Sequence, residues 1–248
     1  MSDDTDPAGG RPITRRSALA FLGALGLGSL VAACTRRSSG AISSSAASSG
    51  SSQSVAPGCL LTPEVTEGPY YLPLNLVRRD ITESKKGVPL QLDLQVVDAS
   101  SCQPISGAVI DIWHADALGV YSGVVPLRAG STASSTSGTF LRGIQSTDDN
   151  GVATFKTIYP GWYMGRAVHI HVKVHLDDQT VHTGQLFFDD SLTSNVYRGN
   201  APYDARGDPD RTDRTDDIYQ QAGASGAILT MKRKANGYVG TMTMGVNA

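Results

Sequence analysis

The sequence predicts an all-β fold, a β-sandwich of mainly antiparallel strands. The first observation is a strict alternation of apolar with other residues from Val88 to Val96, which is typical of a strand with one buried face. The second is a series of further short segments of strand character, at residues 108–114, 152–158, 167–176 and 181–188. The third is that no long amphipathic helix pattern follows residue 60. Short strands separated by turn signals favour a sandwich.

Two turn signals predict hairpins within this series. Residues 148–151, Asp-Asp-Asn-Gly, stand between two predicted strands, and Asn236-Gly237 interrupts the apolar tail. Sequences of this kind readily form tight turns between strands. We therefore expect a hairpin around residues 148–151 and a closing hairpin formed by residues 227–245.

The N-terminal segment predicts export. Arg15 and Arg16 precede an apolar stretch at residues 18–33, which is followed by Cys34. This stretch is shorter than a transmembrane helix usually requires. The arginine pair resembles a twin-arginine signal, and Val-Ala-Ala-Cys resembles a lipobox that would make Cys34 a lipidated first residue. An ordinary secretory signal or an uncleaved anchor are the alternatives. We expect an export signal at residues 1–33 and a periplasmic or extracytoplasmic protein anchored to lipid at the cell envelope.

The remaining chain divides into a tether and one domain. Residues 34–57 are rich in Ser, Ala and Gly, which predicts a flexible tether, and residues 58–248 are long enough for one domain with a sizeable core. Cys59 and Cys102 form an even pair in an exported chain, which favours one disulfide, with two unpaired buried thiols as the alternative. A net charge of -2 gives no reason to expect a nucleic-acid partner. An oligomer is compatible with the sequence.

The segment at residues 158–176, IYPGWYMGRAVHIHVKVHL, predicts a metal site. His169 and His171 lie on the same face of a strand because successive side chains alternate, and apolar residues occupy the other face. Tyr163 within the segment and Tyr121 upstream offer phenol oxygens. For the histidines alone, zinc and copper are serious candidates. Each tyrosine alone could be an ordinary aromatic residue with a hydrogen-bonded hydroxyl.

Three segments in order, DIWHADALGVYSG, FLRGIQSTDDNGVATFKTIYPGWYMGRAVHIHVKV and TGQLFF, closely resemble the intradiol ring-cleavage dioxygenases, the group that contains the protocatechuate and catechol dioxygenases. The resemblance covers about half the chain, residues 62–188. It is nearer to the protocatechuate type and to exported single-domain relatives, because the chain has no room for the helical N-terminal region of catechol dioxygenases.

The resemblance implies a non-haem Fe(3+) ion with four protein ligands, which are Tyr121, Tyr163, His169 and His171. Anionic phenolates stabilise the ferric state, and hard oxygen donors oppose soft metals. The resemblance also makes Arg166 a catalytic guanidinium that stabilises negative charge on the substrate ring. It makes Gln185 a residue that orients the site, and Tyr163 a phenolate that leaves the metal and accepts a substrate proton.

The activity implied is the cleavage of a catechol-type substrate by O2 to a muconate-type dicarboxylic acid, without an organic cofactor. Catechol, protocatechuate, hydroxyquinol and halogenated or polyphenolic catechols are all open as substrates. The loops at residues 66–73 and 118–125 are expected to sense ring substituents. The alternative is an exported, non-catalytic β-sandwich binding module, since a fold does not determine a function. A zinc hydrolase would need a carboxylate base near the histidines, and the sequence identifies none.

Other polar residues are expected to have structural roles. His114, His175 and His182 lie outside the ligand pattern and are expected to be structural or exposed. The acidic segment at residues 204–217 lacks the spacing, the turn glycine and the terminal glutamate of a calcium loop. Its interleaved arginines predict a solvated loop with internal charge pairing.

Overall fold

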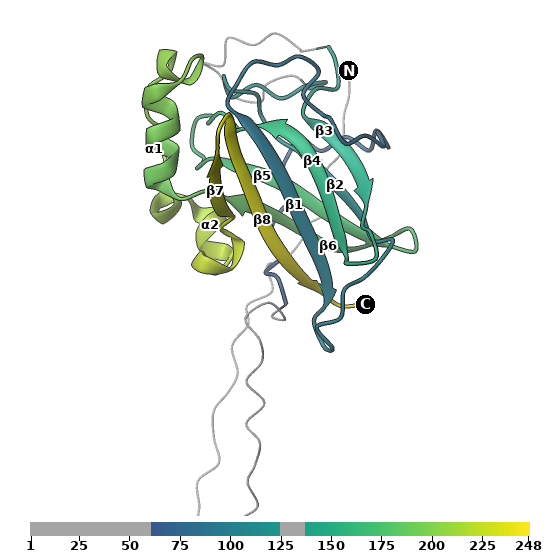
Figure 1. Ribbon diagram of the computed structural model, residues 1–248. Coiled ribbons are helices and arrows are strands. Elements are labelled where there is room, and N and C mark those ends of the chain that lie inside the picture. The colour runs from purple at the N-terminus through teal and green to yellow at the C-terminus, as the bar shows by residue number, and fades with distance from the viewer. Residues whose placement is uncertain (1–60, 125–136) are drawn as a thin grey trace, which may run out of the picture. The chain divides into compact units, whose positions relative to one another are not determined.

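Among residues 61–124 and 137–248, which the computed structural model describes, eight strands form two four-stranded sheets packed face to face (Figure 1). The first sheet has the order β4-β1-β8-β7, with β1 (Pro89–Asp98), β4 (Val152–Ile158), β7 (Thr230–Lys234) and β8 (Gly237–Val246). The second has the order β3-β2-β5-β6, with β2 (Val109–Trp113), β3 (Arg142–Ser146), β5 (His169–Leu176) and β6 (Gln179–Phe187). Neighbouring strands are antiparallel except β1 and β8, which are parallel. The predicted sandwich of mainly antiparallel strands is confirmed.

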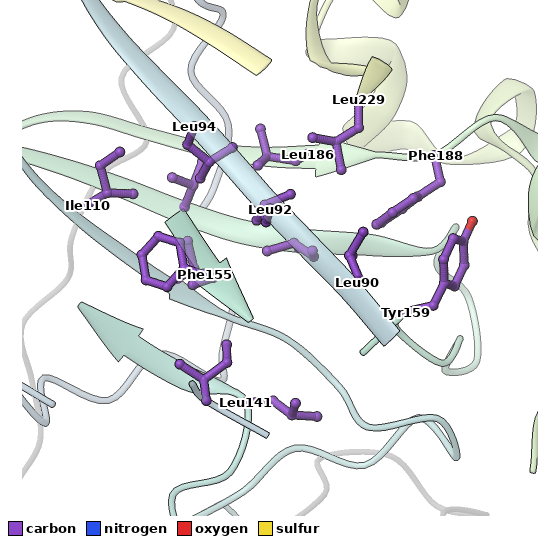
Figure 2. Close-up of a cluster of buried hydrophobic side chains, with 14 of the residues drawn as sticks. Leu90, Leu92, Leu94, Ile110, Leu141, Phe155, Tyr159, Leu186, Phe188 and Leu229 are labelled. Carbon is purple, nitrogen blue, oxygen red and sulfur yellow. The ribbon is translucent and has the colours of Figure 1, made fainter. Parts of the chain in front are cut away.

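The core lies between the facing sides of the two sheets. Leu90, Leu92 and Leu94 on β1 are at most 2% exposed and point toward the second sheet, as Figure 2 shows. Ile110 on β2 and Leu186 on β6 belong to the same cluster. Full burial of one such side chain contributes about 1.5–3 kcal/mol. The alternation that predicted β1 is therefore the inward face of the first sheet.

One predicted hairpin forms and the other does not. β7 and β8 are antiparallel and Lys234 lies opposite Gly237, which confirms the closing hairpin. A turn does form at residues 148–151, where the Asp148 carboxylate accepts the N–H groups of Asn150 and Val152 at 2.9 Å each. This turn joins β3 to β4, which belong to different sheets, so the predicted hairpin is wrong. Strand β4 pairs with β1 instead.

Two short helices, which the sequence analysis did not locate, lie between β6 and β7: α1 (Asp190–Gly199) and α2 (Asp217–Gln221). In Figure 1 both lie beside β7 at one side of the sandwich. Three 3-10 turns accompany them, η1 (Tyr203–Ala205), η2 (Asp213–Thr215) and η3 (Ala224–Ala227). Asp189 and Asp216 are the N-caps of α1 and α2; Asp189 accepts one backbone N–H group and Asp216 accepts two that the first helical turn leaves unpaired.

Several sequence predictions fall on residues outside the described part of the chain. These are the export signal, the lipobox with Cys34, the tether and Cys59. Cys102 is disulfide-bonded. None of the helices in residues 61–124 and 137–248 is both long enough and apolar enough to span a membrane.

Candidate metal centre

Two histidines stand side by side on the outer face of β5. His169 is 3% exposed and His171 is fully buried, while Ile170 and Val172 between and after them face the core. His169 Nδ1 lies 2.7 Å from the carbonyl oxygen of Ala167. A carbonyl only accepts, so Nδ1 carries the proton and the lone pair of Nε2 is directed away from the strand. The two Nε2 atoms are 3.1 Å apart.

The two predicted tyrosines bring their hydroxyls to the same point. Tyr121 Oη lies 3.1 Å from Nε2 of His171, and Tyr163 Oη lies 3.4 Å from Nε2 of His169. Donor atoms that each lie about 2.0–2.1 Å from one metal ion are separated by roughly 3 Å. Two oxygens and two nitrogens therefore converge with the spacing of a ligand set.

Burial determines the protonation states that this site favours. It lowers the pKa of His169 and His171 well below the ordinary value, so both imidazoles are neutral and able to donate a lone pair. Burial raises the pKa of the Tyr121 phenol well above the ordinary value and also raises that of Tyr163. A buried phenolate thus needs a compensating cation. The donor set fits a highly charged metal ion that would stabilise two phenolates.

No group of three or more His, Cys, Asp or Glu side chains in the described part of the chain is arranged to hold a metal. The candidate ligands are therefore the mixed set of two histidines and two tyrosines, and no carboxylate belongs to it.

Arg166 lies beside this set and is held from two sides. Its Nε donates to Asp216 Oδ2 at 2.8 Å, and its Nη2 donates to Gln185 Oε1 at 2.6 Å. Its Nη1 is directed toward Tyr163 Oη at 3.4 Å. Burial alone would lower the pKa of the guanidinium, but Tyr163 and Asp216 raise it, so Arg166 is charged.

Gln185 occupies its place because of strand register. It lies opposite His171 across the β5–β6 pair, so both side chains project from the same outer face. Its Nε2 donates to the carbonyl oxygen of Thr66 at 2.8 Å, which orients Oε1 toward Arg166. The structure thus brings all six predicted site residues together.

Comparison with known proteins shows the family of the chain. A family model described as dioxygenase matches residues 66–196. An intradiol ring-cleavage dioxygenase from Tetranychus urticae is 32% identical, with a TM-score of 0.70 over 76% of this chain and 95% of the other. The chain belongs to the intradiol ring-cleavage dioxygenase family.

Two further relatives define the extent of the likeness. The dioxygenase domain of a dioxygenase carbohydrate-binding protein fusion from Streptomyces sp. SirexAA-E is 30% identical, with a TM-score of 0.54, and the match covers 73% of this chain and 95% of that domain. Catechol 1,2-dioxygenase 1 from Acinetobacter lwoffii is 32% identical over 107 residues. That alignment covers 41% of this chain and 32% of the curated relative, so the chain spans about a third of its length.

In this member of the family, the loop that carries Tyr121 is fixed on both sides. Before it, Asp116 Oδ1 accepts the N–H groups of Leu118 and Val120 at 2.9 and 3.0 Å. After it, Arg142 donates to Ser122 through Nε to Oγ at 3.0 Å and through Nη2 to the carbonyl oxygen at 2.8 Å. Arg142 is 3% exposed, and sequence reasoning did not identify it.

Aromatic rings pack around the candidate ligands. Trp113 lies opposite His171 in the β2–β5 register and stacks on its imidazole, with ring centroids 4.9 Å apart and an interplanar angle of 5°. Tyr70 stacks on Tyr121 with centroids 4.4 Å apart and meets the edge of Tyr163 at 5.7 Å. The loop at residues 66–73, expected to sense the substrate ring, therefore does reach the two tyrosines.

The other histidines are outside the ligand set, as expected. His114 is fully buried, with Nδ1 2.8 Å from the Ala115 carbonyl oxygen and Nε2 2.7 Å from Thr157 Oγ1. His175 contacts Thr180 Oγ1 at 3.0 Å, and His182 is buried in the second sheet.

The acidic segment at residues 204–217 differs from its prediction. Asp208 pairs with Arg198 of α1, and Asp216 is 1% exposed and pairs with Arg166. Both partners lie outside the segment, so the predicted internal pairing is wrong, whereas most residues of the segment are exposed as predicted. The segment packs against the loop before β5, and this burial turns Asp216 inward.

Proposed function

We propose that the chain is an Fe(III)-dependent enzyme that cleaves a catechol-type aromatic between its two hydroxyl-bearing carbons. The reaction would use O2 and yield a muconate-type dicarboxylic acid. The observation that carries this proposal is the convergence of two phenol oxygens and two imidazole nitrogens at 3.1–3.4 Å, beside a partly buried guanidinium. Membership of the family supports a catechol as substrate with O2.

Tyr121, Tyr163, His169 and His171 would hold the ion. When bound, ferric iron supplies positive charge that favours an ionised catechol and makes its ring reactive toward O2. His169 and His171 are buried and neutral, and the Ala167 carbonyl fixes the direction of the His169 lone pair. The chain would therefore hold the ion without rearrangement of these two side chains.

Tyr163 would accept a substrate proton at Oη. It lies on the loop between β4 and β5 and is half-buried, whereas Tyr121 is 5% exposed. Because less of its surface is packed, movement of Tyr163 would cost less than movement of Tyr121. Arg166 Nη1 at 3.4 Å stabilises negative charge on this oxygen before the proton arrives.

Arg166 also stabilises negative charge that develops on the substrate ring. A guanidinium that is already oriented by Asp216 and Gln185 needs no reorganisation during the reaction. Tyr70 and Trp113 surround the ligands with apolar ring surface, which excludes water and strengthens each charge interaction.

Oxygen uptake by the iron-loaded chain tests this function. The panel comprises catechol, protocatechuate, hydroxyquinol and a chlorocatechol, with products analysed after reaction under labelled O2. We expect both labelled atoms in a muconate-type diacid, and a red to burgundy protein because ferric tyrosinate absorbs visible light. A yellow semialdehyde would show cleavage beside the diol and contradict the proposal. A colourless chain that consumes no oxygen would favour a binding module instead.

We further propose that the enzyme is exported by the twin-arginine route and anchored through Cys34. The arginine pair and the lipobox pattern support this location. Replacement of Arg15 and Arg16 by lysine should retain folded precursor in the cytoplasm. Cys34→Ala should release the protein from the membrane fraction with its iron content unchanged. Unchanged export from cells without the twin-arginine machinery would contradict the route.

A further inference from the structure

The two carboxylate oxygens of Asp216 make their shorter hydrogen bonds to different groups, and Arg166 Nη2 adds a longer contact to Oδ1 at 3.4 Å. Oδ1 accepts the N–H groups of Ile218 and Tyr219 at 2.9 and 3.0 Å and thereby caps α2. Oδ2 accepts Nε of Arg166 at 2.8 Å and the backbone N–H of Ala167 at 2.7 Å. The side chain is fully buried. The helix cap therefore fixes the direction in which the second oxygen points.

Oδ2 of Asp216 restrains the segment that enters β5. It binds the side chain of Arg166 and the next backbone N–H, and the carbonyl oxygen of Ala167 then contacts His169 Nδ1 at 2.7 Å. Gln185 holds Nη2 of the same guanidinium. With Nε and Nη2 held by these two residues, the fork geometry of the guanidinium directs Nη1 toward Tyr163.

The pairing is also required by burial. A guanidinium and a carboxylate that are removed from water are each costly unless they are paired and hydrogen-bonded. Arg166 has one charged partner in the described residues, Asp216, because Gln185 is neutral. Asp216 lies beyond the residues that the family model matches, so this contact comes from the chain segment that follows α1.

We infer that Asp216 is a positioning residue, which orients Arg166 so that Nη1 faces the reacting groups of the candidate metal centre. Its effect on turnover rests on the proposed dioxygenase function. Its effect on Arg166 itself does not, because the contact is made by protein atoms alone.

The decisive variant is Asp216→Asn in the full chain. The amide oxygen can still cap α2, but the amide nitrogen cannot accept from Arg166 or Ala167. We expect kcat for the best catechol to fall about 10- to 100-fold, the usual effect of removing an outer-shell partner, with KM changed less than about twofold. The matched control is Asp189→Asn at the N-cap of α1, which contacts no site residue and should leave both parameters unchanged.

A double-mutant cycle separates positioning from general damage. In an Arg166→Leu background, Asp216→Asn should cause no further loss of kcat, because the group on which it acts is absent. An equal loss in both backgrounds would overturn the inference. If Asp216→Asn does not fold, Asp216→Ser replaces it in the same cycle, since a serine hydroxyl also caps a helix.

A measurement on the iron-free chain distinguishes failure of this inference from failure of the proposed function. The Arg166 Nε–H signal in nitrogen-15 NMR should be shifted and exchange slowly in the wild type and in Asp189→Asn. It should lose both properties in Asp216→Asn. An unchanged signal would overturn the inference even if the enzyme is active. A changed signal with a wild type that consumes no oxygen would support the contact while refuting the dioxygenase function.

Discussion

Gly68 offers a test of the candidate metal centre through a single added methyl group. Its φ is +71°, and a Cβ built there would lie 3.1 Å from Cε1 of His171. At that distance the imidazole must move by a few tenths of an ångström. Gly107 is the matched control, because its φ is +78° and a Cβ there meets nothing within 4 Å. Gly68→Ala and Gly107→Ala thus share a backbone cost and differ in the contact with His171.

The expected stability change can be worked out from the backbone. A left-handed conformation costs an alanine about 1–2 kcal/mol. The reduced entropy of the unfolded chain returns about 0.4–1 kcal/mol. Both variants should therefore lose about 1 kcal/mol of unfolding free energy, measured by urea denaturation of the iron-free chain. Gly68→Ala should lose slightly more unfolding free energy than Gly107→Ala, and the difference should equal the strain of displacing the His171 imidazole.

The two variants should differ in their affinity for the metal. His171 Nε2 lies within 3.1 Å of two other donor atoms, so a small displacement disturbs the whole set. Competition with a ferric chelator should show affinity about 10- to 100-fold lower for Gly68→Ala. Gly107→Ala should match the wild type. Equal iron retention by both variants would refute the assignment of His171 as a ligand.

Other changes test the remaining roles. Tyr121→Phe or His169→Ala should bleach the iron-loaded protein or abolish metal retention, because each removes one of four donors; stoichiometric iron by metal analysis with unaltered visible absorbance would contradict this. Arg166→Leu should keep the colour and catechol binding while kcat falls about 100- to 1,000-fold. Burial, followed by the charge of Asp190, raises the pKa of Asp213 from 3.8 to about 8. The folded state therefore binds the proton more tightly, and stability is lost as the pH rises through this range. As the pH rises from 4 to 9, the unfolding free energy of Asp213→Asn should increase relative to that of the wild type by on the order of a few kcal/mol, measured by urea unfolding. A difference between the two proteins that does not change with pH would count against the raised pKa.

The strands were predictable where one face alone carries the apolar residues. β4 has the predicted bounds of residues 152–158, and the alternation in β1 matches its buried face. The pairing of the strands was harder to predict from the sequence. The turn at residues 148–151 has the local chemistry of a hairpin, yet it passes from one sheet to the other. A local turn signal predicts a reversal of the chain and carries no information on which sheet the next strand joins.

The candidate ligands were accessible for a different reason. His169 and His171 are two positions apart on one strand, so a single strand assignment places both on one face. Tyr121 and Tyr163 came from the family resemblance, since nothing local connects a tyrosine in the loop after β2 with one in the loop before β5. Arg142 and Trp113 were missed because their roles depend on strand register and on the loops that they contact.

The contact of Asp216 with Arg166 could not be predicted from the sequence, because it depends on tertiary packing. Its capping role has a local signal, an aspartate before the short helix at residues 217–221. Its second oxygen reaches Arg166, which is 50 positions away, and only the packing of the segment against the entry to β5 creates that contact. The sequence pattern of interleaved charges is the same for a solvated loop and for a loop in which one carboxylate points inward. Because α2 holds Oδ1, a five-residue helix outside the sandwich determines where Oδ2 points, and through it where the guanidinium of Arg166 faces.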